Sequence, residues 1–395
     1  METLPTELQE ILCSHLDGDS LLRACSVSPQ WNRIISSLQP VWRYLCLHLG
    51  TSSVNYIADN WKTLYITCRR LLQHLKKGSA FKHRNFIPEN FHASVIRGLV
   101  YGNGYLFAGI HNLVQVWRVS DLQYVAKFQV PYKLSCLTAS PDGQVLGVGC
   151  HNGAITTWQL FYEKKICTEP LMKYHRHAGY ITAMDISTEL DLLCSGGSDR
   201  TTRVWNLFSG VLLWTATMNS SVSQIIMMPH YILLLADEVS IQRFSWLTQG
   251  GRLEATGPSI LTGASMRRFL IHDRKLVYVR NGGAIVILDW CTGETLHQLS
   301  LGCTDIDLVA VGAKFMLAAL WDNFCRKQEL VIIDLSSGSV VGSYPMPYCR
   351  PEYVVAGETA WLSGLAYWKP ETLVIATSNA FQATHCFYLV TWRCM

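Results

Sequence analysis

The spacing of hydrophobic positions changes near residue 90. Before that point, apolar residues recur every three or four positions, which is the period of an amphipathic helix. After it, apolar and polar residues alternate in short runs that are separated by Gly, Asn, Asp and Pro, as in strands joined by turns. We therefore predict an α plus all-β chain of several domains, with a short helical region followed by a long β region.

The N-terminal region predicts three short helices. The first carries Leu4, Leu8, Ile11, Leu12 and Leu16, with Pro5 in its first turn. Asp19 or Ser20 is expected to cap the second, which carries Leu21, Leu22 and Cys25. The third is expected to start near Ser28-Pro29 and to carry Trp31, Ile34 and Ile35. Helices this short cannot bury all their apolar faces on one another, so a partner helix or the rest of the chain must cover the remainder.

Residues 1–50 resemble an F-box. The residues that carry the resemblance are Leu4, Pro5, Glu7, Leu8, Ile11, Leu12, Leu16, Leu21, Leu22, Val27, Trp31, Asn32, Trp42, Leu45 and Cys46. F-boxes dock onto the Skp1 adaptor of cullin-RING ubiquitin ligases. The resemblance therefore implies Skp1 as a partner, and through it the cullin-1/RING ligase core. It places at or beside that interface Leu4, Pro5, Leu8, Ile11, Leu16, Leu21, Leu22, Val27 and Trp31.

Residues 51–78 form a basic connector. Between Trp61 and Pro88 the chain has seven Lys or Arg residues and no acid. Apolar residues recur here at helical spacing, which predicts a linker helix that ends near Gly78. The basic side chains are interpreted as a solvated face and not as a nucleic-acid site, because no exposed aromatic residues are interleaved with them.

Residues 79–395 contain a repeat. Similar runs end at seven marker residues, 39 to 59 positions apart: Trp117, Trp158, Trp205, Phe244, Leu288, Ile333 and Trp392. A period of about 40 to 45 residues with four strands per unit is the spacing of a WD40 propeller, so we predict seven blades. The segment "SAFKHRNFIP" is expected to lend an outer strand to the last blade and so close the ring. The long last interval is assigned to a loop in "PMPYCRPEYVVAGETAWLSGL", whose prolines fit a loop better than a central strand.

The third repeat has the complete polar set of a well-kept WD40 blade, in His177, Ser195, Asp199 and Trp205. The first three are also the residue types of a nucleophilic triad. Because Trp205 can donate to Ser195, we interpret the four as a buried structural network. Together with the N-terminal segment, this repeat is similar to the F-box/WD40-repeat proteins.

That resemblance implies a non-catalytic substrate receptor of a ubiquitin ligase, whose propeller holds a protein substrate on its top face. Catalysis would then be by proximity. The candidate substrate-binding residues are Tyr180, Thr182, Ser198, Arg200, Arg97, His151, Arg267 and Arg268. Arginine clusters can read phosphorylated peptides, but the sequence does not show whether these arginines converge. Two alternatives stay open: a WD40 scaffold that acts independently of ubiquitylation, and an enzyme that uses Ser195 and His177.

Composition narrows the other classes. The net charge of +4 over 395 residues is small, so neither nucleic acid nor a membrane surface is expected as a partner. The apolar runs are too short to cross a bilayer, and the first residues do not read as a secretory signal, so we expect a cytoplasmic or nuclear location. The 14 cysteines include no C-x-x-C pair and predict reduced thiols without a metal site. "YGNGYLFAG" lacks the third glycine of a dinucleotide-binding motif and predicts a hairpin, and no cofactor is expected.

Overall fold

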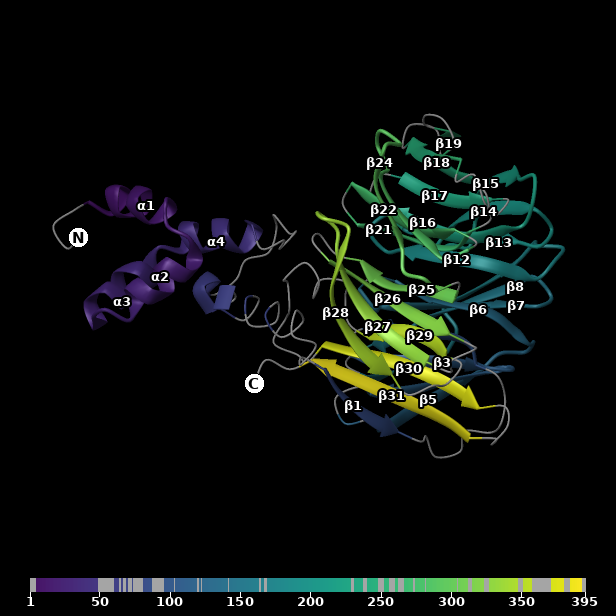
Figure 1. The fold of residues 1–395 in the computed structure, drawn as a ribbon. Coiled ribbons are helices and arrows are strands. Elements are labelled where there is room, and N and C mark those ends of the chain that lie inside the picture. Colours follow the sequence, from purple (N-terminus) through teal and green to yellow (C-terminus); the bar gives the residue numbers. More distant parts are fainter. Residues whose placement is uncertain are drawn as a thin grey trace.

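A computed structural model of the chain shows a small helical unit and a larger unit built only of sheets (Figure 1). It describes residues 5–48, single positions between 60 and 73, residues 81–86, and residues 96–392 with gaps, of which 357–370 is the longest. The change from helical to alternating periodicity in the sequence therefore corresponds to the change of architecture.

The helical unit contains four short helices, one more than predicted. They are α1 (Thr6–Ser14), α2 (Gly18–Cys25), α3 (Pro29–Ser37) and α4 (Gln39–His48). The cap of α2 is Asp17, whose carboxylate accepts the Ser20 N–H, so the prediction of Asp19 or Ser20 was wrong by two or three residues. Ser28 caps α3 by accepting the Trp31 N–H, which confirms the predicted start.

The connector packs into the core of this unit. Its described positions 61–63, 65–66, 69 and 73 are helical, as predicted, and the predicted end at Gly78 lies outside the described residues. Trp61 and Tyr65 are buried in one cluster with Trp42, and the rings of Trp42 and Tyr65 lie 5.4 Å apart. A Cβ on Gly18 would overlap the Tyr65 hydroxyl, so this close approach requires glycine. The connector thus completes the apolar core of the four helices.

The sheets follow one another along the chain as antiparallel meanders. The first three consist of β2 (Ile96–Gly102), β3 (Tyr105–Ile110), β4 (Leu113–Arg118) and β5 (Tyr124–Gln129); of β6 (Leu134–Ala139), β7 (Val145–Cys150), β8 (Ala154–Gln159) and β11 (Met172–His175); and of β12 (Ile181–Ser187), β13 (Leu192–Gly197), β14 (Thr201–Asn206) and β15 (Leu212–Thr217). A two-stranded ribbon of β9 (Phe161–Tyr162) and β10 (Lys165–Ile166) is inserted before β11.

The later sheets repeat this plan. They consist of β16 (Val222–Met228), β17 (Tyr231–Ala236), β18 (Ser240–Leu247) and β19 (Arg252–Ala255), with β20 (Ile260–Leu261) also paired to β18; of β21 (Met266–His272), β22 (Lys275–Arg280), β23 (Ala284–Asp289) and β24 (Thr295–Ser300); of β25 (Asp305–Val311), β26 (Phe315–Asp322), β27 (Lys327–Asp334) and β28 (Ser339–Met346); and of β1 (Phe81–Phe86), β29 (Pro351–Ala356), β30 (Glu371–Asn379) and β31 (Thr384–Trp392). The architecture is a β-propeller. The predicted count of seven blades stays a proposal, because residues 87–95 and 357–370 beside the last sheet lie outside the described residues.

The marker residues occupy equivalent places in these sheets. Each lies in the third strand of its meander, from Trp117 in β4 to Trp392 in β31. The pairing of the third with the fourth strand shifts register next to the marker at Trp117, Trp205, Leu288 and Ile333. Such a bulge increases the local twist of the outer strand. The period in the sequence therefore reports a repeated backbone feature, whichever side chain fills it.

The closure of the last sheet confirms one prediction and corrects another. β1 pairs with β31 from Phe81 opposite Trp392 to Phe86 opposite Phe387, so the segment before the first sheet does supply an outer strand (Figure 1). The loop assigned to "PMPYCRPEYVVAGETAWLSGL" is partly strand, because Pro345 lies in β28 and Pro351 begins β29. Both are strands at the edge of their sheets, where the missing N–H of proline is tolerated.

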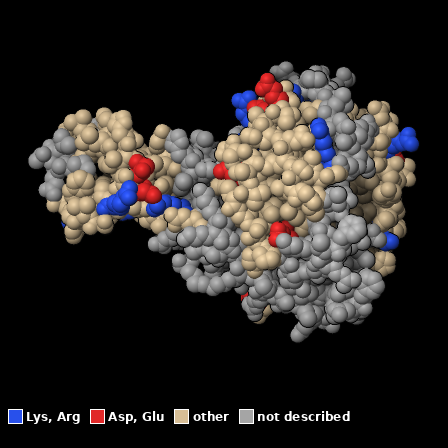
Figure 2. Space-filling model, viewed as in Figure 1, with Lys and Arg blue, Asp and Glu red and all other residues tan. Residues whose placement is uncertain are grey.

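Two kinds of feature are absent from the residues that the structure describes. Among the residues that the structure describes, no helix is long and apolar enough to cross a membrane. In the same residues, no group of three or more His, Cys, Asp or Glu side chains is placed to hold a metal ion. Among the described residues on the face shown in Figure 2, Lys, Arg, Asp and Glu are scattered in small groups of both signs.

Candidate functional site

The third blade, formed by β12–β15, brings the predicted polar set together at one end of its strands. β13 ends at Gly197 and β14 begins at Thr201, so the intervening turn carries Asp199 beside Ser195. His177 comes from the segment that enters the blade before β12. Gly197 leaves room here, because a Cβ at this position would overlap both the Asp199 carboxylate and the His177 ring. The turn and the histidine are thus packed against each other across glycine.

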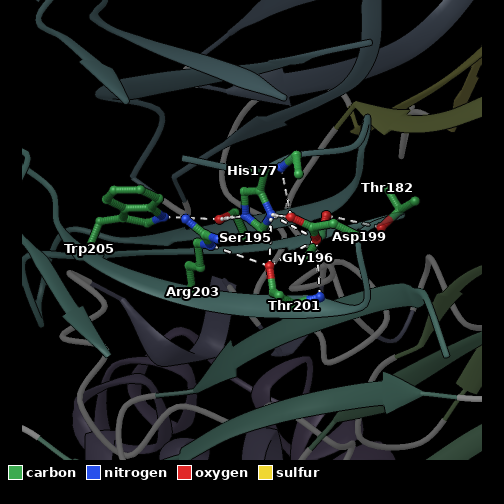
Figure 3. A network of polar contacts seen from close by, with 9 residues as sticks. His177, Thr182, Ser195, Gly196, Asp199, Thr201, Arg203 and Trp205 are labelled. Atoms are coloured by element: carbon green, nitrogen blue, oxygen red, sulfur yellow. Dashed lines mark hydrogen bonds and ion pairs between the residues drawn. The ribbon is translucent and has the colours of Figure 1, made fainter. Parts of the chain in front are cut away.

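The four residues form the expected chain of hydrogen bonds (Figure 3). The Trp205 Nε1–H donates to Ser195 Oγ at 2.9 Å, and Ser195 Oγ lies 2.9 Å from His177 Nε2. His177 Nδ1 lies 3.1 Å from both Asp199 oxygens. Asp199 also accepts the Ala178 N–H at 2.9 Å and the Thr201 hydroxyl at 2.8 Å. The sequence-based interpretation of a satisfied polar network is confirmed in this geometry.

The protonation states of the network follow from its environment. Burial raises the pKa of Asp199, but the N–H of Ala178 and the hydroxyl and N–H of Thr201 outweigh it and bring the value down to about 2. Burial lowers the pKa of His177 despite the neighbouring Asp199. A neutral imidazole then carries its proton on Nδ1 and accepts the Ser195 hydroxyl proton on Nε2. Every donor and acceptor in the chain thus has a partner.

Burial distinguishes this network from a catalytic triad. Ser195 is 0% exposed and His177 is buried, with its ring enclosed by Asp199, Ser195 and Thr201. A nucleophile must reach a substrate carbon within about 3–3.5 Å in the bound state. An oxygen that is fully covered and already engaged with His177 and Trp205 offers no such approach. The arrangement therefore has the contacts of a buried structural network and leaves a substrate no access to Ser195.

A ledge of exposed side chains surrounds the same end of the first three blades. We use the name polar ledge for His111, Tyr132, Lys133, His151, Tyr180 and Arg200, all exposed. Backbone bonds join them in series: the Leu134 N–H donates to the His111 carbonyl, and the His151 N–H donates to the Lys133 carbonyl. The rings of His151 and Tyr180 lie 5.7 Å apart, and the Tyr180 carbonyl accepts the Ser198 N–H. The ledge is therefore one continuous surface across three blades.

Arg200 occupies a strained place on this ledge. The last residue of the turn between the second and third strands has a positive φ in three blades: Gly153 at 81°, Arg200 at 59° and Gly283 at 81°. In each, its N–H donates to the carbonyl three residues earlier. Two blades use glycine, for which this conformation carries no steric penalty, whereas an L side chain pays about 1–2 kcal/mol. An exposed arginine held there is the kind of outlier that marks functional positions.

The helical unit presents a second candidate surface. Leu8, Ile11, Leu12, Leu16 and Val27 are between 39% and 71% exposed, although they are large and apolar. Isolated exposed apolar residues are ordinary, but four of these five recur at helical spacing on and just after α1. Leu21 is fully buried and Leu22 and Trp31 are packed against the core, so these three support the surface from inside. Pro5 is exposed, and Leu4 lies outside the described residues.

Comparison with known proteins agrees with both units. The F-box-like family matches residues 1–48, and the WD domain, G-beta repeat family matches residues 168–206, which contain the His177 network. F-box/WD repeat-containing protein 2 from Rattus norvegicus is 28% identical over 422 aligned positions, covering 100% of this chain and 87% of the relative. The Homo sapiens protein of the same name matches with the same identity and coverage.

The chain is thus homologous along its whole length to F-box/WD repeat-containing protein 2.

The other predicted substrate-binding residues are half-buried or lie outside the described residues. Thr182 is half-buried and its hydroxyl donates to the Gly196 carbonyl in β13 at 3.0 Å, so it is not free on the ledge. Ser198 lies beside Tyr180 and is half-buried. The side chains of Arg97, Arg267 and Arg268 lie outside the described residues. Of the predicted set, the structure thus brings together Tyr180, His151 and Ser198, with Arg200 in the adjoining turn.

Sequence reasoning missed several members of both groups. Thr201 bridges the network, since its hydroxyl also lies 3.1 Å from His177 Nδ1, and Arg203 donates to it at 3.3 Å. Tyr132 and Lys133 also belong to the ledge. They lie in the connection from β5 of the first blade to β6 of the second, which has no recognisable motif. The available signal was positional: residues just before a first strand and just after a second strand lie at the same end of an antiparallel meander.

Proposed function

We propose that the protein is the substrate-recognition subunit of a Skp1-cullin-F-box ubiquitin ligase. In this proposal, the exposed apolar face of the helical unit binds Skp1 and thereby the cullin-1/RING core, while the propeller holds a protein substrate. The observation that carries it is the pairing of that apolar face with a separate exposed ledge on a propeller. An apolar helix face is the usual docking surface for a partner helix.

We also propose that the propeller has seven blades in a closed ring. The support is that each of the seven marker residues lies in its own meander of four or more strands, and that β1 and β31 join the two ends of the repeat region. Adjacent meanders are tied by direct bonds, for example the two hydrogen bonds between Gln224 and the backbone of Phe269. A closed ring leaves no sheet edge open at the start or end of the repeat.

The polar ledge is the proposed substrate site, and its charge favours an acidic segment. Among the described ends of the first three blades, the ledge end carries the exposed cations Lys133, Arg176 and Arg200. The one carboxylate described there is Asp199, which is already held by His177 and Thr201. The opposite end carries Asp142, Glu169, Glu189 and Asp191, together with Asp121, which is paired with Arg118. Complementary charge of this kind steers partners and sets specificity more than affinity.

The receptor acts without its own catalytic group in this proposal. Support comes from the burial of Ser195 and His177, because the only triad-like set in the described part of the chain is closed to substrate. Ubiquitin transfer would then depend on the effective concentration of the bound substrate near the charged enzyme. A serine-directed active-site probe should leave the folded protein unlabelled.

The proposal is tested by capture of the full chain from cells with its bound proteins. The double variant Leu8→Asp, Leu12→Asp places two charges on the apolar face and should abolish capture of Skp1 and cullin while substrate capture persists. Val211→Asp, Leu213→Asp is the matched control, because these residues are 55% and 38% exposed at the start of the outer strand of the third blade. Absence of Skp1 and cullin from the wild-type capture would refute the proposal. Unchanged ubiquitylation of the captured proteins in the Leu8, Leu12 variant would favour a scaffold.

A further inference from the structure

A lone carboxyl group lies at the joint between the third and fourth blades. Asp185 is in the middle of β12, the innermost strand of the third blade, and β12 packs against β6, β7, β13 and β16. These five strands read ITAMDIS, LSCLTA, VLGVGC, LLCSGG and VSQIIMM. Asp185 is their only Asp, Glu, Lys, Arg or His. The titratable side chains that these strands place around it are the thiols Cys136, Cys150 and Cys194.

The two carboxyl oxygens of Asp185 accept hydrogen bonds from backbone N–H groups. Oδ1 accepts the N–H of Ile186 at 2.9 Å, and Oδ2 accepts the N–H of Met227 at 2.6 Å. The second bond crosses from β12 to β16 and so ties one blade to the next. Asp185 forms no ion pair within the described part of the chain, and burial raises its pKa to about 7. The pKa of Cys194, its cross-strand neighbour, is raised by its own burial and by the Asp185 charge.

We propose that the joint between the third and fourth blades is a proton-sensitive switch, closed when Asp185 is neutral and opening more often when it is ionised. An ionised carboxylate buried among uncharged strands is poorly solvated, and local opening lets water reach it. Asp185 as a whole residue is only partly covered, so protons can exchange with solvent. The strand that carries Asp185 also leads to the polar ledge, because Tyr180 of the ledge immediately precedes β12.

The sign of the effect is set by linkage. The ordinary pKa of this group is 3.8, and the folded value lies above it. The closed joint therefore binds more protons than the open one, and its stability falls as the pH rises toward the folded value. Between pH 6 and pH 8 the population of the open joint should rise by about tenfold and then level off.

Asp142 provides a matched control at the neighbouring joint. Its Oδ2 accepts the Thr188 hydroxyl at 2.8 Å, which ties the second blade to the third. Burial raises its pKa, but hydrogen bonds from Ser140, Gln144 and Thr188 outweigh it and hold the value below the ordinary one. Asp142 thus stays ionised from pH 6 to pH 8. Asp142 and Asp185 both connect neighbouring blades. They differ because hydrogen bonds lower the pKa of Asp142 more than burial raises it, whereas burial dominates the pKa of Asp185.

The test is amide hydrogen exchange of the full chain at pH 6, 7 and 8, corrected for the intrinsic pH dependence of exchange. The peptide over 222–228 contains the Met227 amide, and the uncharged strand 105–110 is an internal reference. Protection of 222–228 should fall about tenfold from pH 6 to pH 8 in the wild type and in Asp142→Asn, and should be constant in Asp185→Asn. Constant protection in the wild type would refute the switch, as would a slope that persists in Asp185→Asn.

A second measurement covers the case in which Asp185→Asn does not fold. Carboxyl infrared absorption of the wild-type chain, labelled with ¹³C aspartate, should show one carboxyl group that titrates between pH 6 and pH 8. Its absence would also refute the proposal. Neither readout requires Skp1 or a substrate, so the switch and the proposed ligase function succeed or fail separately.

Discussion

The third and fifth blades reach the same backbone geometry by different means. In the third, Trp205 donates to Ser195 and the chain continues to His177 and Asp199. In the fifth, formed by β21–β24, Leu288 stands at the marker position and is buried in a cluster with Phe269, Leu276, Tyr278 and Trp290. Both blades show the register shift beside the marker. The comparison shows that the same bulge forms beside a hydrogen-bonded tryptophan and beside a buried leucine.

The largest expected effects come from removing the buried marker in either blade. Trp205→Ala should lower the free energy of unfolding by about 3–5 kcal/mol and Leu288→Ala by about 2–5 kcal/mol, since both leave a cavity in a packed core. Urea unfolding of the full chain, followed by tryptophan fluorescence, measures both. A loss below about 1 kcal/mol for Leu288→Ala would show that the fifth blade does not depend on its apolar marker. Trp205 and Leu288 would then not be equivalent in their blades.

A smaller effect isolates the hydrogen bond. Trp205→Phe keeps a buried ring but removes the donor to Ser195, so it should cost about 1–3 kcal/mol beyond the loss of ring volume. Trp158→Phe in the second blade is the matched control, because Trp158 is buried but donates no hydrogen bond to the described residues. Equal losses in the two variants would mean that the polar chain adds no stability to the third blade.

Acid should weaken the polar network of the third blade. The folded pKa of Asp199 is about 2, below its ordinary 3.8, so its contribution is present above pH 3.8 and is lost as the pH falls toward 2. The lowered pKa of His177 acts in the same direction below its ordinary 6.5. Asp199→Asn should therefore lower the urea midpoint at pH 7 and have little effect at pH 2. An equal loss at both pH values would contradict the charged network.

The smallest expected effect concerns the turn. Arg200→Gly gives the third blade the residue that the fifth has at Gly283. It should raise the free energy of unfolding by less than about 1 kcal/mol, because the greater freedom of glycine in the unfolded chain offsets part of the relieved strain. The same variant should weaken capture of substrate, because it removes a ledge cation. A stable variant with undiminished capture would show that Arg200 is not part of the binding site.

The features of the fold that could be predicted from the sequence are those that depend on residue spacing or residue type. The period of the markers, the pairing of β1 with β31 and the His177 network could be read because each rests on spacing or on residue type. Asp17 was missed as a cap because Asp17, Asp19 and Ser20 have similar capping preferences, and only packing selects among them. The strand at Pro351 was missed because edge position is a property of the sheet and not of the segment.

The site was predictable to a lesser extent. Tyr180 and His151 were proposed separately, and their ring contact depends on how neighbouring blades are set side by side. Asp185 gave no signal at all, since one acid in an alternating strand looks like a solvent-facing residue. What isolates it is the absence of charge on four other strands, and the topology must be known before those strands can be compared.

The pairing of β1 with β31 has a consequence for synthesis of the chain. The strand that leaves the connector is among the first parts of the propeller to emerge from the ribosome, and its partner is among the last. Until residues 384–392 are made, β1 has an open edge that can pair with other chains. Premature termination near the C-terminus would leave that edge exposed for good. The last strand to be made thus covers the edge that one of the earliest strands leaves open.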